Sequence, residues 1–305
     1  MKFAFSAEQL EFRDGLRDLL TKECTPGHLR DAWTNDAGRV PGLWDKLVEL
    51  GVTAVMAPES AGGFGLSYVD LVLLLEETGR HAVPEPIVET AAIAVPLTAS
   101  VDRCIAACGP LAPWADSADA ILTGRDDLVL VERAAAKLTS RPSVDGARRL
   151  FEVDFGEVAR TFGDDEHGAA FDRGALGFAA QQCGLADRML ELTVDYVKER
   201  TQFGVPVGSF QAVKHHLANA RVALEFARPL VYRAAVTLDS AHVSMAKAQA
   251  DEAALTTARA ALQCHGAIGY TTEYDLHLYM KRSWTLARSW GDAAWHRDRV
   301  GRAIL

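Results

Sequence analysis

Apolar positions recur at helical spacing near both ends of the chain and at strand spacing between them. The apolar residues from 10 to 20 repeat near helical period, behind Ser6, which can cap a helix together with Gln9. A second amphipathic stretch around Trp44 stops at Gly51. We therefore expect residues 1–100 to form an N-terminal helical domain.

The pattern of apolar and polar residues changes between residues 101 and 165. Short runs with strand character lie at 120–122, 128–132 and 150–155, and Gly, Asp and Pro separate them. These runs predict a small β domain over residues 101–165.

Helical periodicity then dominates to the end of the chain. Long stretches lie near 170–200, 209–241 and 243–265, and shorter ones near 275–288 and 292–304. Apolar faces such as that of Leu185, Met189 and Leu192 suit an antiparallel helix bundle over residues 166–305. The predicted fold class is mainly α.

Composition narrows the classes of partner and location. The chain has 305 residues, a formal charge of −9 and a pI near 5.5. Binding to a phosphate backbone needs clustered Lys and Arg, so we expect no nucleic-acid partner. A membrane span needs roughly 20 apolar residues, and the start of the chain lacks a leader pattern, so we expect a cytoplasmic protein without membrane contact.

The five cysteines, Cys24, Cys104, Cys108, Cys183 and Cys264, form an odd and scattered set. A chain of this length does not need a disulfide framework, and we predict none. Cys104 and Cys108 are four residues apart but have no second Cys/His pair, so we predict no metal site.

Two local motifs in the C-terminal half are distinctive enough to indicate a protein family. One is Arg200, Thr201, Gln202, Phe203, Gly204, and the other is the run from Gln263 to Tyr270. Both resemble the cofactor-binding signatures of the acyl-CoA dehydrogenase family, flavoenzymes that desaturate the Cα–Cβ bond of acyl-CoA thioesters. The order helical, strand-rich, helical bundle is also that family's order. The resemblance therefore implies an acyl-CoA dehydrogenase-like fold.

The resemblance also implies which residues meet the cofactor. In the family these motifs contact the ADP portion of an FAD held chiefly by the neighbouring subunit. Carried over by position, the implied cofactor-binding residues are Arg200, Gln202, Phe203, Gly204, Gln263, His265, Gly266 and Ala267. A guanidinium can pair with pyrophosphate oxygens, and glycine allows close backbone approach. The alternative is that Arg200 is one more solvated charge and Phe203 one more core aromatic.

The family's catalytic base has no counterpart at its usual positions. Removing the α-proton needs a carboxylate, but the position of the family's glutamate falls on Trp290 and the alternative position falls at or near Ala241. We therefore predict no catalytic residue in this chain. A displaced base at Asp292, Asp239 or Glu273 is the alternative to a role of these carboxylates as helix caps or solvated charges.

A segment that grips the flavin ring in complete family members also has no counterpart between the first helical domain and Trp114. We therefore expect a truncated β domain. The chain resembles the non-catalytic subunit of actinobacterial α2β2 heteromeric acyl-CoA dehydrogenases of steroid degradation. This implies an FAD shared with a catalytic acyl-CoA dehydrogenase subunit in a heterotetramer, with the acyl-CoA bound mainly by that partner. The alternatives are a flavin oxidase or monooxygenase of the same fold, and a flavin-free structural partner.

Overall fold

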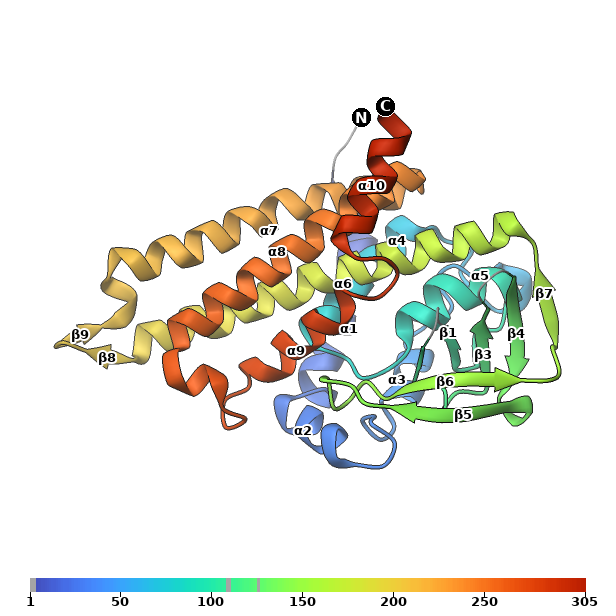
Figure 1. The fold of residues 1–305 in the computed structure, drawn as a ribbon, viewed down its shortest axis with the longest axis horizontal. Helices are drawn as coiled ribbons and strands as arrows, with labels where there is room; N and C mark the ends of the chain where they lie inside the picture. Colours follow the sequence, from blue (N-terminus) through green and yellow to red (C-terminus); the bar gives the residue numbers. More distant parts are fainter. Residues whose placement is uncertain (1–3, 108–110, 125–126) are drawn as a thin grey trace.

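The computed structural model describes residues 4–107, 111–124 and 127–305, so Cys108 lies outside the described residues. Three kinds of region follow one another along the chain (Figure 1): helices, strands and a long helix bundle. This is the predicted mainly helical architecture. The division of the chain at residues 100 and 165 stays a prediction.

The N-terminal region is helical. Ser6 and Gln9 form the predicted capping box, in which the Gln9 amide N–H donates to Ser6 Oγ (3.2 Å) and the Ser6 amide N–H donates to Gln9 Oε1 (2.8 Å). The helices are α1 (Ala7–Glu23), α2 (Pro26–Thr34), α3 (Leu43–Glu49), α4 (Tyr68–Arg80), the π-helix η2 (Val88–Ala94) and α5 (Val95–Thr98).

Two small sheets make up the middle region. The first has the order β1 (Ile105–Ala107), β3 (Ala120–Thr123), β4 (Leu128–Glu132), β7 (Arg160–Phe162), and only its β1–β3 pair is parallel among the described strands. The second has the order β2 (Ala112–Pro113), β6 (Leu150–Phe155), β5 (Ala136–Arg141). The three runs predicted as strands correspond to β3, β4 and β6.

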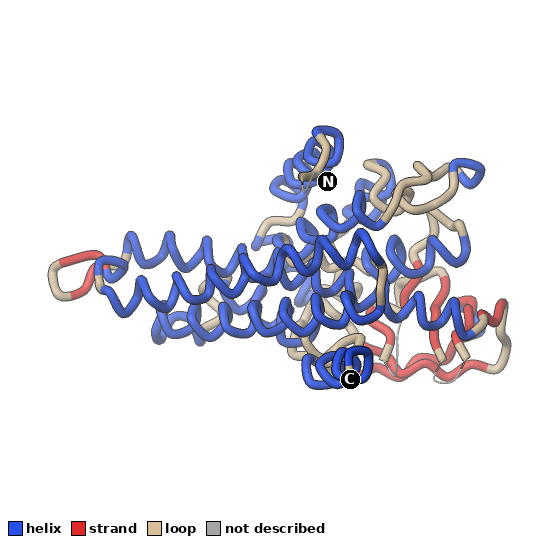
Figure 2. Tube along the Cα trace, turned by 90° about the horizontal axis from the view of Figure 1, so that it is seen from above, coloured by secondary structure: helices blue, strands red, loops and turns tan. Residues whose placement is uncertain are grey.

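The C-terminal region is a bundle of α6 (Asp164–Glu199), α7 (Gln211–Thr237) and α8 (Ser240–His265), followed by α9 (Leu276–Leu286) and α10 (Ala293–Ile304). The three long helices run side by side, and a hairpin of β8 (Thr201–Gln202) and β9 (Val205–Pro206) joins α6 to α7 at the end far from the sheets (Figures 1 and 2). The predicted helix 209–241 was too long, because Leu238 takes a positive φ of 47° and ends α7.

Two glycines let α4 and α6 cross at close range. A Cβ on Gly79 would lie 2.1 Å from the carbonyl oxygen of Gln181, and one on Gly184 would lie 1.9 Å from that of Glu76. No other residue fits at either position without moving the backbone. The helices before the sheets therefore share one hydrophobic core with the bundle.

A buried arginine joins the three regions. Arg282 of α9 pairs with Asp145 of the β5–β6 loop and donates to the carbonyl oxygen of Val83 (2.8 Å). Truncating a buried charge of this kind leaves its partner unpaired, which costs about 3–5 kcal/mol. The contact fixes the bundle against both preceding regions.

Candidate cofactor site

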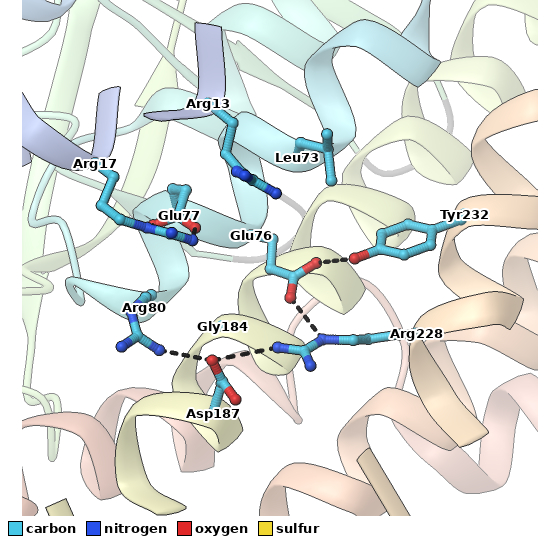
Figure 3. Close-up of a pocket in the computed structure, with 10 residues that line it drawn as sticks. All are labelled: Arg13, Arg17, Leu73, Glu76, Glu77, Arg80, Gly184, Asp187, Arg228 and Tyr232. Carbon is cyan, nitrogen blue, oxygen red and sulfur yellow. Dashed lines mark hydrogen bonds and ion pairs between the residues drawn. The ribbon is translucent and has the colours of Figure 1, made fainter. Parts of the chain in front are cut away.

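Two hollows in the described part of the chain bear on function, and the first is lined by a network of ion pairs. It measures about 230 Å³ and lies among α1, α4, α6 and α7. Figure 3 shows Arg80 paired with Asp187 (2.6 Å) and Arg228 paired with Glu76 (2.8 Å). The other two arginines of the lining also have partners, Arg17 with Glu77 and Arg13 with Asp14. These charges neutralise one another, so they hold helices together, and the described residues that line this hollow leave no free cation for a ligand.

The second hollow lies at the hairpin end of the bundle and measures about 390 Å³. We call it the bundle-end hollow, and its lining residues are Tyr196, Arg200, Gln202, Val207, Ala212, Val213, His216, Gln263, Cys264, His265, Gly266 and Ala267. The two sequence motifs, which are some sixty residues apart, therefore meet at one place. Six of the eight predicted cofactor residues line it, and Phe203 and Gly204 do not.

Arg200 differs from the arginines of the first hollow. It is exposed at the C-terminal end of α6, and its guanidinium forms no hydrogen bond or ion pair with any residue that the structure describes. The first turn of α7, with Ala212 and Val213, also lines the bundle-end hollow. A free guanidinium and a helix N-terminus both attract an anion. The arrangement suits a phosphate or diphosphate group.

Phe203 and Gly204 form the tip of the β8–β9 hairpin. Both have positive φ, 54° and 81°, as a two-residue hairpin turn requires. The Phe203 side chain is 92% exposed and lies edge-on to Phe210, with ring centroids 6.2 Å apart. The interpretation of Phe203 as a core aromatic is therefore wrong, and its ring projects away from the chain.

The second motif ends α8. Gly266 has φ 63° and ψ −138°, a conformation that favours glycine, and a Cβ there would meet nothing within 4 Å. Ala267 is exposed and is not among the residues with positive φ, so its methyl group causes no backbone strain. Both residues line the bundle-end hollow.

His265 is a fixed part of the wall. Its Nδ1 donates to the carbonyl oxygen of Ala261 (2.8 Å), and its ring stacks on Tyr196 with centroids 4.5 Å apart. Burial lowers the pKa of His265, so the ring is neutral near pH 7. His265 therefore shapes the hollow but supplies no positive charge for a phosphate.

The sequence motifs did not identify the α7 contribution, Ala212, Val213 and His216. The start of α7 was predicted near residue 209, and a helix start beside Arg200 was the available signal. Small apolar residues in a first turn have no chemical pattern of their own, so only the fold shows that they face the hollow.

Trp290 lies in the loop between α9 and α10 with a positive φ of 57°. Its indole lies against α6: a Cβ on Gly174 would be 2.7 Å from the indole, and the Phe171 ring is 5.9 Å away. His296 Nε2 donates to the Trp290 carbonyl oxygen (2.8 Å), and Lys247 Nζ donates to that of Gly291 (3.3 Å). The loop is held from both sides.

Two of the three carboxylates considered as displaced bases, Asp292 and Asp239, have structural partners. Asp292 accepts from the Trp295 amide N–H (3.0 Å), and this hydrogen bond lowers the pKa of Asp292. Asp239 caps α8 in the same way, and the amide N–H of His242 lowers the pKa of Asp239. A lowered pKa makes a carboxylate a weaker base. Glu273 is exposed near the end of a loop.

No group of three or more metal-ligating side chains occurs among residues 4–107, 111–124 and 127–305. Within the same ranges, Cys24, Cys104, Cys183 and Cys264 are free thiols. None of the helices in the described part of the chain is long and apolar enough to span a membrane.

Comparisons with known proteins agree with this geometry. Residues 6–100 match the N-terminal domain of acyl-CoA dehydrogenases, and residues 167–305 match their C-terminal domain. The chain is 35% identical to acyl-CoA dehydrogenase IpdE2 of Mycolicibacterium smegmatis over 91% of this chain and 93% of that protein. The chain belongs to the acyl-CoA dehydrogenase family.

A second curated relative and two solved structures are also similar to this chain. Acyl-CoA dehydrogenase IpdE2 of Mycobacterium tuberculosis is 33% identical over 90% of this chain and 91% of that protein. A solved variant of the Tcur3481–Tcur3483 steroid acyl-CoA dehydrogenase matches at TM-score 0.89 and 27% identity, over 97% of both chains. The ChsE4–ChsE5 complex from Mycobacterium tuberculosis shares the fold at TM-score 0.91, with 24% identity over 100% of this chain and 99% of that one.

The family uses FAD, and the bundle-end hollow fits part of that molecule. Arg200, the first turn of α7 and the exposed backbone at Gly266 offer groups that attract a diphosphate, and Gln202 and Gln263 offer amides. One free arginine neutralises only part of a diphosphate's charge. The residues thus fit the diphosphate and the ADP portion of FAD in part.

Proposed function

We propose that this chain is the non-catalytic subunit of a heteromeric, FAD-dependent acyl-CoA dehydrogenase. Its bundle-end hollow receives the ADP portion of an FAD whose ring lies in a catalytic partner that carries the glutamate base. FAD would supply the hydride acceptor for Cα–Cβ desaturation. This chain's residues bind and orient the far end of the cofactor, with Arg200 pairing with its diphosphate.

The observation that carries the proposal is the contrast between two positions. Arg200 is a free cation at an open hollow, whereas Trp290 stands at the base position and packs on α6. Such a chain keeps groups suited to a cofactor and lacks the group that would abstract a proton. A heterotetramer of the α2β2 kind accounts for both.

For the complex we propose a bulky acyl-CoA substrate, such as the CoA thioester of a steroid-derived acid. The support is the relation to a solved steroid acyl-CoA dehydrogenase that pairs two proteins. In this proposal the acyl-CoA lies mainly in the partner, because Trp290, Phe171 and Gly174 pack together at this chain's own base position.

The test is Arg200→Ala in the complex co-expressed with a glutamate-bearing homologue. Loss of a charge-assisted hydrogen bond should raise the FAD dissociation constant about ten- to a hundredfold. Flavin absorbance per heterodimer after gel filtration measures it. Arg302→Ala is the matched control, because Arg302 lies on α10 and pairs with Asp298 on the surface of its own helix (2.5 Å).

Three outcomes would contradict the proposal. One is unchanged flavin retention in Arg200→Ala, which would leave a structural partner without a flavin role. Another is a fully active homo-oligomer of this chain alone. A third is flavin reoxidation with peroxide or a hydroxylated product in the absence of a partner, which would indicate an oxidase or monooxygenase.

A further inference from the structure

The bundle-end hollow has a second side chain that can carry a positive charge. His216 lies on the second turn of α7, three and four residues after Val213 and Ala212, so these residues share the helix face that lines the hollow. His216 is exposed, and its imidazole forms no hydrogen bond or ion pair with any residue that the structure describes. It is therefore available to a ligand, as Arg200 is.

The rest of the lining supplies no further positive charge near pH 7. Besides Arg200 and His216, its titratable side chains are Tyr196, Cys264 and His265. From α8, burial raises the pKa of the Cys264 thiol and lowers the pKa of the His265 imidazole. From α6, the Tyr196 hydroxyl donates to the carbonyl oxygen of His265 (3.3 Å). No carboxylate is among the described lining residues, so none competes with an anion for the two cations.

A diphosphate calls for more positive charge than Arg200 provides. Each of the two phosphates of FAD carries one negative charge near neutral pH, and a guanidinium offsets one of them. The first turn of α7 adds free backbone amides, because no side chain caps it. The charged neighbours in the chain, Lys198, Glu199 and Lys214, are exposed and are not part of the lining. The imidazolium form of His216 is thus the group that can offset the second phosphate charge.

We propose that His216 is a further cofactor-binding residue, which in its protonated form pairs with the diphosphate of FAD together with Arg200. This inference rests on the proposed function, because it needs the ADP portion of FAD in the bundle-end hollow. An imidazole changes its charge between pH 5 and 8, so His216 should bind FAD more tightly at pH 6 than at pH 8. An arginine keeps its charge throughout this range and produces no such dependence.

The experiment compares His216→Gln with His215→Gln in the complex co-expressed with a glutamate-bearing homologue. Release of FAD on serial dilution, followed by flavin fluorescence, gives the dissociation constant at pH 6 and at pH 8. The ratio of the two constants should be about fivefold smaller in His216→Gln than in the wild type, as loss of an exposed ion pair predicts. His215→Gln should keep the wild-type ratio, because His215 is also exposed but does not line the hollow. Titrating groups of the partner cancel in this comparison.

His216→Lys tests the charge itself. A lysine ammonium stays charged at pH 8, so this variant should bind FAD at pH 8 about fivefold more tightly than the wild type does. A merely structural role of His216 would not produce that gain, and its absence would overturn the inference.

Arg200→Ala separates this inference from the proposed function, since it should weaken FAD binding at both pH values. If Arg200→Ala releases flavin while His216→Gln keeps the wild-type ratio, the function stands and the inference is wrong. If neither substitution changes FAD binding, the proposed function is wrong and the inference falls with it. An equal loss of the ratio in His215→Gln and His216→Gln also overturns the inference, because the effect would then not depend on the hollow.

Discussion

Glu89→Gln should stabilise the protein at alkaline pH. Glu89 lies on the π-helix η2, is 2% exposed, and its Oε1 has no hydrogen-bond partner among the described residues. Burial raises the pKa of Glu89 from 4.5 to about 7, and the attraction of Arg148 offsets this only in part. The ionised carboxylate is therefore costly in the folded state.

The sign and size of the change in stability with pH follow from the shift in the pKa of Glu89. Because the folded pKa is the higher one, the folded protein binds this proton more tightly, and the stabilisation present below pH 4.5 is lost as the pH rises to about 7. Each pKa unit corresponds to about 1.4 kcal/mol. By pH 8 ionisation of Glu89 should cost about 3 kcal/mol, which the glutamine variant avoids.

Urea unfolding at a series of pH values from 5 to 8 measures the effect. The difference in free energy of unfolding between variant and wild type should be small at pH 5 and grow to about 3 kcal/mol at pH 8. Glu85, whose pKa burial also raises to about 7, cancels in the difference. A difference that does not change with pH would refute the reasoning.

Two further predictions concern backbone positions. Gly184→Ala should cost about 2–3 kcal/mol, because its methyl group would lie 1.9 Å from the Glu76 carbonyl oxygen. The control Gly15→Ala lies in open space on α1 and should raise the free energy of unfolding by up to about 1 kcal/mol. Equal melting temperatures for the two variants would contradict the close crossing of α4 and α6. Phe203→Asn should relieve the positive φ and stabilise the lone chain by up to about 1 kcal/mol, yet weaken flavin retention in the complex. Unchanged retention would remove Phe203 from the proposed site.

Periodicity predicted the helices well because long amphipathic runs repeat many times. It missed β1 and β7, which are only three residues long, and β5, where Lys137 and Arg141 hide the strand pattern. It also missed the break at Leu238, because leucine carries no turn signal. Short strands and turns of this kind depend on tertiary contacts that a local pattern does not contain.

The site was predictable where two motifs carried it. Arg200 and Gln263 were expected to share one place, and the structure brings both to the bundle-end hollow. The sequence could not show whether Arg200 has an ion-pair partner, because that depends on which residues the fold places beside it. The contact of Trp290 with Gly174 was equally hidden, because it joins residues far apart in the chain.

The loop that carries Trp290 limits what position 290 can hold. Its carbonyls accept hydrogen bonds from His296 and Lys247, and the Trp290 indole occupies the space that Gly174 leaves on α6. Trp290→Glu would empty that space and place a charge beside Phe171, so the variant would lose stability. Under the proposed function, proton abstraction and cofactor binding would therefore stay on separate chains, because the packing at this position opposes a carboxylate.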